Sequence, residues 1–130
     1  MKEKQSLADQ GRLVVGIHDA PPAPMQIGSP EAGDFRGYEV DLLNEFAARL
    51  TVLLQYRRNV WSTIINDLRE GQIDLVCSAA LVTRERQQEV DFSEPYLTID
   101  LAIARLRGDG RGKRLAGEKV GVRSGTTAES

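Results

Sequence analysis

The sequence predicts an α/β fold in which helices flank a mostly parallel sheet. Short apolar runs at 12–17, 52–56 and 74–78 have the length and the β-branched composition of buried strands. Between them, at 38–50 and 62–70, apolar residues recur with a helical period. This alternation of strand and helix is typical of βαβ units, and 130 residues are enough for one modest domain with a real core.

The first predicted strand, 12–17, runs into a loop that carries polar side chains. Three prolines within 21–24 deny this loop both ladder and helix hydrogen bonds. Open α/β sheets bind ligands just beyond the carboxyl ends of their strands, so His18 and Asp19 are candidate ligand contacts. The alternative is that both are ordinary turn residues, with Asp19 capping the local backbone.

The helix at 38–50 has the clearest pattern of the chain. We expect its apolar stripe to face the sheet and its polar residues to face away. The second helix follows Trp61, and Gly71 stands where a left-handed C-cap residue would end it. On the first helix the inward residues are Val40, Leu43, Phe46, Ala47 and Leu50, and the outward ones are Glu39, Asn44, Glu45 and Arg49.

A charged helix at 84–89 is predicted after the third strand. The Thr83 hydroxyl is placed to accept a hydrogen bond from a first-turn amide, as an N-cap does. Arg86 lies in the first turn, where free backbone amides also point, so an anion could meet both. On these residues alone, a solvated helix with surface charges is the alternative. We expect the loops at 18–24, 59–61 and 79–86 to gather at the carboxyl edge of the sheet.

Composition excludes several classes of function. The net charge is −2, and the 17 basic residues are interspersed among 19 acidic ones without a basic stripe, so nucleic-acid binding has little support. Cys77 is the single cysteine, which rules out an intrachain disulfide; it has no partner for zinc and is expected to be a buried core thiol. The glycines of 106–113 lack phosphate-loop spacing, and we expect no cofactor and no metal.

The end of the chain repeats the strand pattern. Apolar runs at 98–105 and 119–122 are predicted strands, although the first could be a crossover segment. No stretch reaches the eighteen apolar residues that would span a bilayer, and 1–10 lacks the apolar core of a signal peptide. Two alternatives stay open, a cytoplasmic protein or an exported one whose signal is not in this chain.

Residues 82–97 carry a family resemblance. Val-Thr-Arg-Glu-Arg followed by Val-Asp-Phe-Ser-Glu-Pro-Tyr resembles the T-x-E-R…DFS-x-PY signature of the polar amino-acid solute-binding proteins, the periplasmic receptors of ABC importers. The resemblance runs in family order from about Leu13 to the end of the chain. It includes the motifs Gly-Tyr-Glu-Val-Asp at 37–41, Gly-Gln-Ile-Asp-Leu at 71–75 and Leu-Ala-Gly-Glu-Lys-Val-Gly-Val-Arg-Ser-Gly-Thr at 115–126.

The resemblance implies two α/β lobes that are joined by a hinge and close over a ligand. The lead-in would be 1–11, lobe one 12–95, the hinge 96–100 and the start of lobe two 101–130, an incomplete bilobed periplasmic-binding-protein-like fold. The apolar strands of lobe two would lack their family partners. We therefore expect this chain to form a homodimer and, because half of the cleft is missing, to bind small solutes poorly.

The same resemblance assigns the site in lobe one. Arg86 matches the arginine that clamps the ligand carboxylate bidentately. Trp61 matches an aromatic residue that covers the ligand, and Ala79 a position whose backbone carbonyl accepts the ligand ammonium. His18 or Asp19 occupies a slot that often holds an acidic contact.

Lobe two would contribute from 123–127. Arg123 matches a side-chain contact, and the amide of Thr127, beside Thr126, matches a donor to the carboxylate. The chain departs from the family at Leu81, which follows Ala79 and stands where a threonine hydroxyl usually accepts from the ammonium. A carboxylate ligand without an α-amino group is therefore an alternative.

The resemblance implies a receptor that binds a small polar solute, an amino acid or related carboxylate, and delivers it to a membrane permease. Its location would be periplasmic or extracellular. One alternative is the sensing domain of a membrane receptor such as a histidine kinase. Another is a dehydratase-type enzyme on the same fold, but no nucleophile–base pair or metal cluster is readable, so we expect no enzyme.

Overall fold

The computed structural model describes residues 7–20, 22–108, 116–122 and 126–128. The chain divides into two compact units, Met1–Phe92 and Ser93–Ser130, and each is described by itself. Among the described residues, no helix combines the length and the apolar composition that crossing a bilayer requires.

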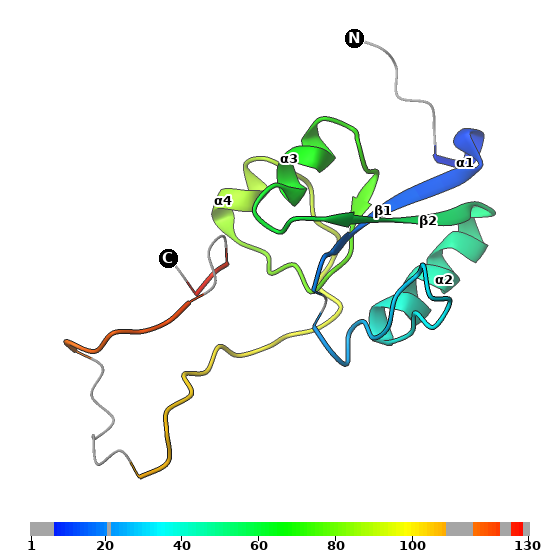
Figure 1. The fold of residues 1–130 in the computed structure, drawn as a ribbon. Coiled ribbons are helices and arrows are strands. Elements are labelled where there is room, and N and C mark those ends of the chain that lie inside the picture. Colours follow the sequence, from blue (N-terminus) through cyan, green and yellow to red (C-terminus); the bar gives the residue numbers. More distant parts are fainter. Residues whose placement is uncertain (1–6, 21, 109–115, 123–125, 129–130) are drawn as a thin grey trace. The chain divides into compact units, whose positions relative to one another are not determined.

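The first unit is built on three parallel strands in the order β2-β1-β3, which Figure 1 shows with their helices. The central strand β1, Arg12–His18, pairs along its whole length with β2, Leu53–Asn59. On its other side it pairs with β3, Leu75–Val76. The prediction of a mostly parallel sheet with flanking helices is confirmed.

Strand β3 is shorter than the predicted strand at 74–78. Side chains on both sides of it take hydrogen bonds from β1 that a longer ladder would have used. The backbone N–H of Val14 donates to Oδ2 of Asp74 at 2.9 Å, and that of His18 to the Ser78 hydroxyl at 3.1 Å. Side-chain oxygens of this kind compete with the ladder and end it.

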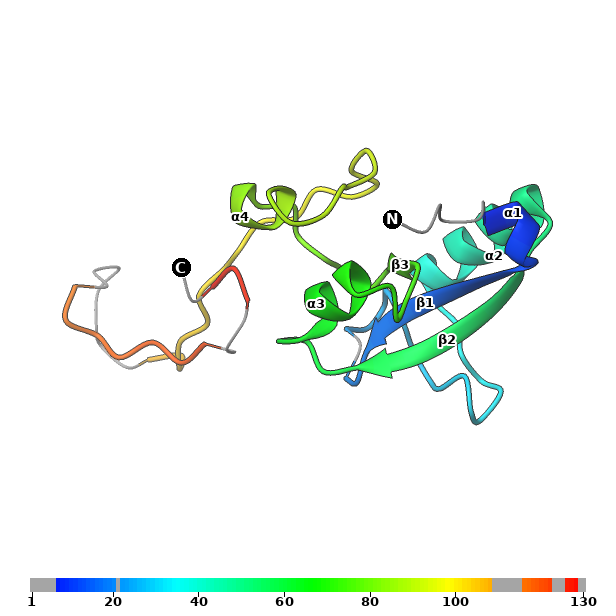
Figure 2. The same ribbon diagram turned by 90° about the horizontal axis from the view of Figure 1, so that it is seen from above.

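Helices α2, Tyr38–Leu50, and α3, Ile64–Arg69, lie on opposite faces of the sheet (Figures 1 and 2). The chain leaves β1 towards β2 through α2, and leaves β2 towards β3 through α3. The two crossovers run in opposite directions along the sheet. Because both connections are right-handed, their helices lie on opposite faces. The loops that follow β1 and β2 therefore leave the carboxyl edge of the sheet towards opposite faces.

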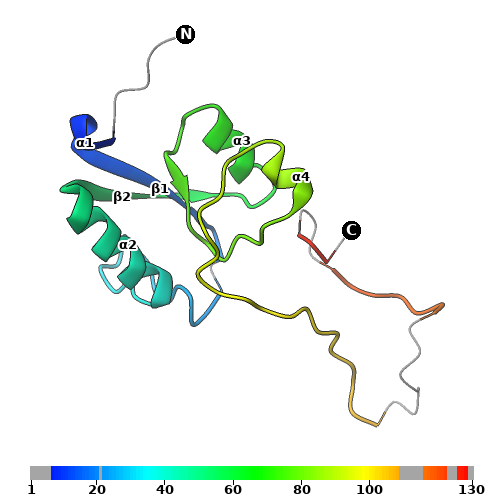
Figure 3. The same ribbon diagram turned by 180° about the vertical axis from the view of Figure 1, so that it is seen from behind.

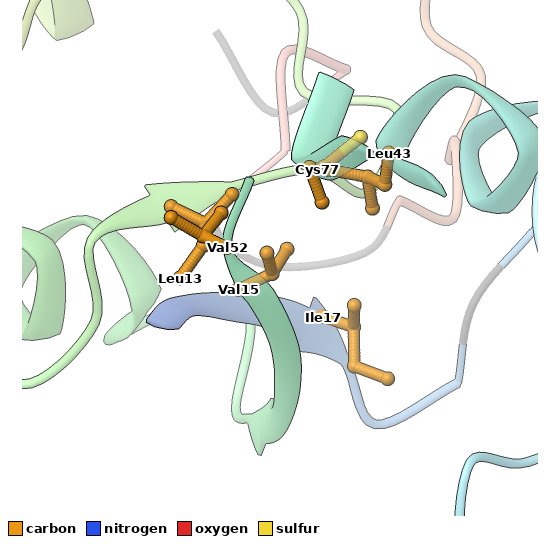
Figure 4. Close-up of a cluster of buried hydrophobic side chains, with 7 residues drawn as sticks. Leu13, Val15, Ile17, Leu43, Val52 and Cys77 are labelled. Atoms are coloured by element: carbon orange, nitrogen blue, oxygen red, sulfur yellow. The ribbon is translucent and has the colours of Figure 1, made fainter. Parts of the chain in front are cut away.

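The core lies between the sheet and α2 (Figure 4). Alternate residues of β1 face the helix, and Cys77 joins them, which confirms the prediction of a buried thiol. The predicted length of α2 is confirmed, and Gly71 has a φ of 73° just beyond α3, as a C-cap residue requires. The core cluster consists of Leu13, Val15, Ile17, Leu43, Ala47, Val52 and Cys77.

Two residues of α2 contradict the predicted faces. Glu39, expected outside, is fully buried, and Phe46, expected inside, is 41% exposed. Glu39 lies in the first turn, at the sheet edge, where its carboxylate accepts hydrogen bonds from two loops. Phe46 lies at the margin of the apolar stripe, beyond the part that packs on the sheet. The helical period of the apolar residues does not by itself show how much of the helix surface packs on the sheet.

The other short helices are α1, Leu7–Gln10, and α4, Arg84–Gln87. In the second unit the described residues form neither helix nor strand (Figure 3). The predicted strands at 98–105 and 119–122 are thus not formed there. Their apolar pattern is present, but a strand needs a hydrogen-bonded neighbour, and the described residues supply none.

Candidate functional site

The site residues predicted in the first unit lie at the carboxyl edge of the sheet. The backbone N–H of Asp19, just beyond β1, donates to the carbonyl of Asn59 at the end of β2, at 3.2 Å. The N–H of His18 reaches Ser78, beyond β3. These bonds hold the three predicted ligand loops at one edge, as the parallel sheet requires.

The Trp61 ring contacts two other side chains of the site. Its ring centroid lies 5.3 Å from that of His18, with the planes tilted by 30°. The guanidinium carbon of Arg86 lies 5.5 Å from the indole centroid, within the range of a cation–π contact. The fold thus brings together three residues that are far apart in the sequence.

Arg86 is positioned by a local cap. The Thr83 hydroxyl accepts from the Arg86 backbone N–H at 3.2 Å, which confirms the predicted N-cap. Nη1 of the Arg86 side chain donates to the Leu81 carbonyl at 2.9 Å. This bond draws the guanidinium over the loop that follows β3. The planar guanidinium carries five N–H donors, a set that suits a bidentate carboxylate.

His18 is buried and its ring has a fixed orientation. Nδ1 lies 2.6 Å from the Ala20 backbone nitrogen and 2.8 Å from Oδ1 of Asp19. An Nδ1 without a hydrogen accepts from the Ala20 N–H, whereas an Nδ1 that carries a hydrogen donates to Asp19. The two contacts are therefore alternatives. The half-exposed Asp19 carboxylate adds a negative group beside the Trp61 cluster.

Ala79 has a left-handed backbone conformation, with a φ of 51°. For a residue other than glycine this costs about 1–2 kcal/mol, so the surroundings must hold it. Its N–H donates to Oε1 of Glu39 at 2.6 Å. The other carboxylate oxygen of Glu39 accepts from Nε2 of Gln26 at 2.8 Å, and the same nitrogen donates to the Cys77 carbonyl at 2.6 Å.

The sequence analysis missed Glu39 and Gln26. The motif at 37–41 was a signal for Glu39, but an acidic residue in a first helical turn is usually a surface charge that complements the helix dipole. Gln26 has no sequence signal, because it lies in an irregular loop and acquires its role only through partners at 39 and 77.

An ion pair between Arg58 and Glu31 lies at the carboxyl edge of the sheet. Hydrogen bonding from Ser29, aided by the Glu31 backbone and by Arg58, lowers the pKa of Glu31 to about 2. Arg58 contacts Glu31 at 3.3 Å and also donates to the Asp19 carbonyl at 3.2 Å. This arrangement ties the loop at 28–37 to the segment that follows β1.

Four of the predicted site residues remain. Leu81 contributes its carbonyl to Arg86, and its side chain is half-buried. Thr126 and Thr127 belong to the second unit, and Arg123 lies outside the described residues. In the part of the chain that the structure describes, no cluster of three or more His, Cys, Asp or Glu side chains is placed to hold a metal ion.

Comparisons with known proteins agree on one family. The model of the bacterial extracellular solute-binding proteins, family 3, matches residues 13–127. The lysine/arginine/ornithine-binding periplasmic protein of Escherichia coli is 32% identical over 101 residues, which cover 75% of this chain and 39% of that protein. The arginine-bound form of domain 1 from TmArgBP, a protein of T. maritima, is 33% identical with a TM-score of 0.64, covering 72% of this chain and 73% of that one.

Two enzymes also share this sequence pattern. Membrane-bound lytic murein transglycosylase F of Desulfosudis oleivorans is 35% identical over 94 residues, which cover 70% of this chain and 21% of the enzyme. An ancestral cyclohexadienyl dehydratase matches with 30% identity and a TM-score of 0.61, over 70% of this chain and 37% of that one. The chain spans less than half the length of each of these curated relatives.

Proposed function

The chain belongs to the bacterial extracellular solute-binding proteins, family 3, and we propose that it binds a small polar solute, an amino acid or related carboxylate, for uptake by an ABC importer. One observation carries the proposal: the Arg86 guanidinium lies over Trp61 at the carboxyl edge of a parallel sheet. Relatives named for lysine, arginine and ornithine binding support this class of ligand.

Arg86 is the proposed anchor of the ligand carboxylate. Its planar fork donates two parallel hydrogen bonds to the two oxygens, and both bonds are charge-assisted. The Leu81 carbonyl and the Trp61 ring restrict where the guanidinium can point, so less conformational entropy is lost on binding.

Trp61 is the proposed cover of the ligand, and His18 with Asp19 the proposed contacts beside it. An aromatic face supplies apolar area and attracts a cation, which suits the side chain of a basic amino acid. The Asp19 carboxylate, held close to the imidazole, offers a negative charge to the same end of such a ligand.

This chain is proposed to recognise the α-amino group of the ligand less strongly than the family pattern does. We propose that the carbonyl of Ala79 accepts from the ligand ammonium. Leu81 has no hydroxyl to share this task, so the preference for an amino acid over its deaminated analogue should be weaker.

Residues of the second unit are proposed to contribute to ligand binding as well. Arg123 would contribute a side-chain contact, and the backbone amide of Thr127, beside Thr126, would donate to the carboxylate. The match to the family runs to residue 127 and so includes both threonines.

The proposed partners are the ligand and the membrane permease of an importer, and the proposed location is periplasmic or extracellular. A homodimer is also proposed. Alternate residues at 97–103 expose apolar side chains, and a second copy would offer a surface to cover them. These residues are Leu97, Ile99, Leu101 and Ile103.

A sensing domain within a larger membrane protein is the second candidate. The match to a small part of a murein transglycosylase supports it, because the module there accompanies other sequence. The dehydratase match favours catalysis on this fold. Most of the matched proteins are named as binding proteins, however, so we propose a non-catalytic role.

Calorimetric titration of this chain with L-arginine, L-lysine, L-histidine and L-cystine tests the proposal. Because the chain spans less than half the length of its curated relatives, we expect weak but saturable binding of at least one of them. This binding should be lost in Arg86→Ala with an unchanged circular dichroism spectrum. The arginine-bound domain 1 supports binding by a chain of this size. Binding that persists in Arg86→Ala, or no binding of any of the four, would contradict it.

A further inference from the structure

A pair of buried side chains, Glu39 and Gln26, holds the segment that follows β3 from behind. Glu39 is fully buried and Gln26 is 1% exposed. Their amide and carboxylate groups bond to the Cys77 carbonyl and to the Ala79 N–H, on either side of Ser78. Because both side chains are buried, each of these bonds is costly to lose.

The chemistry of the pair requires a carboxylate at position 39. Both neighbours of Glu39 are donors, the Ala79 N–H and the Gln26 amide nitrogen, so position 39 must present two acceptors. A glutamine there would accept one bond and point its own NH₂ at the other donor. The orientation of the Gln26 amide follows in the same way, because both of its Nε2 partners are acceptors.

The segment 77–79, which these hydrogen bonds hold, is the one that faces the ligand in the proposed function. The bond from the Ala79 N–H to Glu39 fixes the peptide plane between Ser78 and Ala79. Ala79 has a φ of 51°, and because the left-handed region of a residue other than glycine allows only a narrow range of ψ, its own carbonyl follows from that plane. With leucine at 81, that carbonyl is the acceptor assigned to the ligand ammonium. Its direction therefore determines how well an α-amino group is read.

We propose that Glu39, supported by Gln26, is a positioning residue that sets the Ala79 carbonyl for the ligand's ammonium group. The inference rests on the proposed function. Arg86 binds the carboxylate, so the two charged groups on the ligand's α-carbon are recognised by separate residues. Loss of Glu39 weakens the recognition of the ammonium and leaves the recognition of the carboxylate in place.

The test compares L-arginine with deamino-arginine, the same molecule without its α-amino group. In Glu39→Met we expect the affinity for L-arginine to fall about ten-fold or more and that for deamino-arginine to change less than about three-fold. Glu45→Met is the matched control, since Glu45 lies on the exposed face of the same helix, and neither affinity should change. Glu39→Gln keeps one acceptor and should give an intermediate loss; it replaces Glu39→Met if that variant does not fold.

An equal loss for both probes would overturn the inference, because it would indicate general loosening of the unit. No loss for either probe, or a wild-type chain that binds both equally, would overturn it too. A second measurement needs no ligand: amide exchange at Ala79 should accelerate about ten-fold or more in Glu39→Met. If the wild type binds neither probe, the proposal of arginine-type ligands fails, and unchanged exchange at Ala79 would then refute the positioning role by itself.

Discussion

Strand β1 presents apolar side chains to helix α2 and a mixed set to helix α3. Towards α2 it buries Leu13, Val15 and Ile17. On the opposite face Gly16 gives room to Ile73, and His18 ends the strand in ring contact with the predicted ligand cover. Because side chains alternate along a strand, one strand serves a stabilising face and a binding face without conflict. Substitutions on the two faces should therefore have separable effects.

Leu43→Ala is expected to have the largest effect on stability. The leucine is buried between α2 and the sheet, so its truncation should lower the free energy of unfolding by about 2–5 kcal/mol. Urea unfolding measures this loss. Leu42→Ala, at a 40% exposed position of the same helix, is the control and should cost under about 1 kcal/mol. Equal losses would show that the α2 face is not the stabilising one.

Gly16→Val asks whether the α3 face also contributes to stability. A Cβ at Gly16 would lie 2.4 Å from Cδ1 of the fully buried Ile73 and 3.2 Å from Oδ1 of Asn59. Overpacking of this kind should destabilise the chain by about 1–3 kcal/mol in thermal or urea unfolding. Gly121→Val, in open space, is the control. A neutral Gly16→Val would mean that this face is loosely packed.

Arg86→Lys should affect binding and leave stability unchanged. A point charge replaces a bidentate fork, so calorimetry should show a loss of about 1–3 kcal/mol in the binding free energy of the carboxylate ligand. The neighbouring exposed Arg84 provides the control, Arg84→Lys. Unchanged affinity in Arg86→Lys would remove Arg86 from the proposed site.

Leu81→Thr should sharpen the choice of ligand. A hydroxyl at this position gives the ammonium a second acceptor, so the preference for an α-amino acid over its deaminated analogue should rise by about 1 kcal/mol. Competition binding measures the ratio, with the exposed Val82→Thr as control. An unchanged ratio would show that position 81 does not face the amino group.

Glu31→Gln should have the smallest effect, and it should depend on pH. The folded-state pKa of Glu31 is about 2, below the ordinary 4.5, so its contribution to stability is present above pH 4.5 and is lost as the pH falls from 4.5 towards 2. Melting temperatures of the two proteins should differ slightly at neutral pH and converge near pH 2. A difference that persists at low pH would assign the effect to packing rather than charge.

Sequence reasoning succeeded where a signal is local. The helical stripe at 38–50, the N-cap at Thr83 and the strands around the core are read from neighbours in the chain. It failed where a partner distant in sequence decides. Glu39, which the helical period assigned to solvent, is buried. The apolar run at 98–105, which the pattern assigned to a strand or a crossover, forms no strand among the described residues. The geometry of the site is intermediate, since the motif pointed to Arg86 but not to its place over Trp61.

By itself, the sequence determined the alternation of strands and helices, the parallel direction of the strands and the chemical nature of the edge. These features depend on period, turn residues and side-chain type. Only the tertiary structure decided that Glu39 is buried beneath Ala79, that β3 stops after two residues, and that three distant side chains meet around one indole. Burial and hydrogen-bond partnership are properties of pairs of segments. They are set when the chain folds and brings those segments into contact.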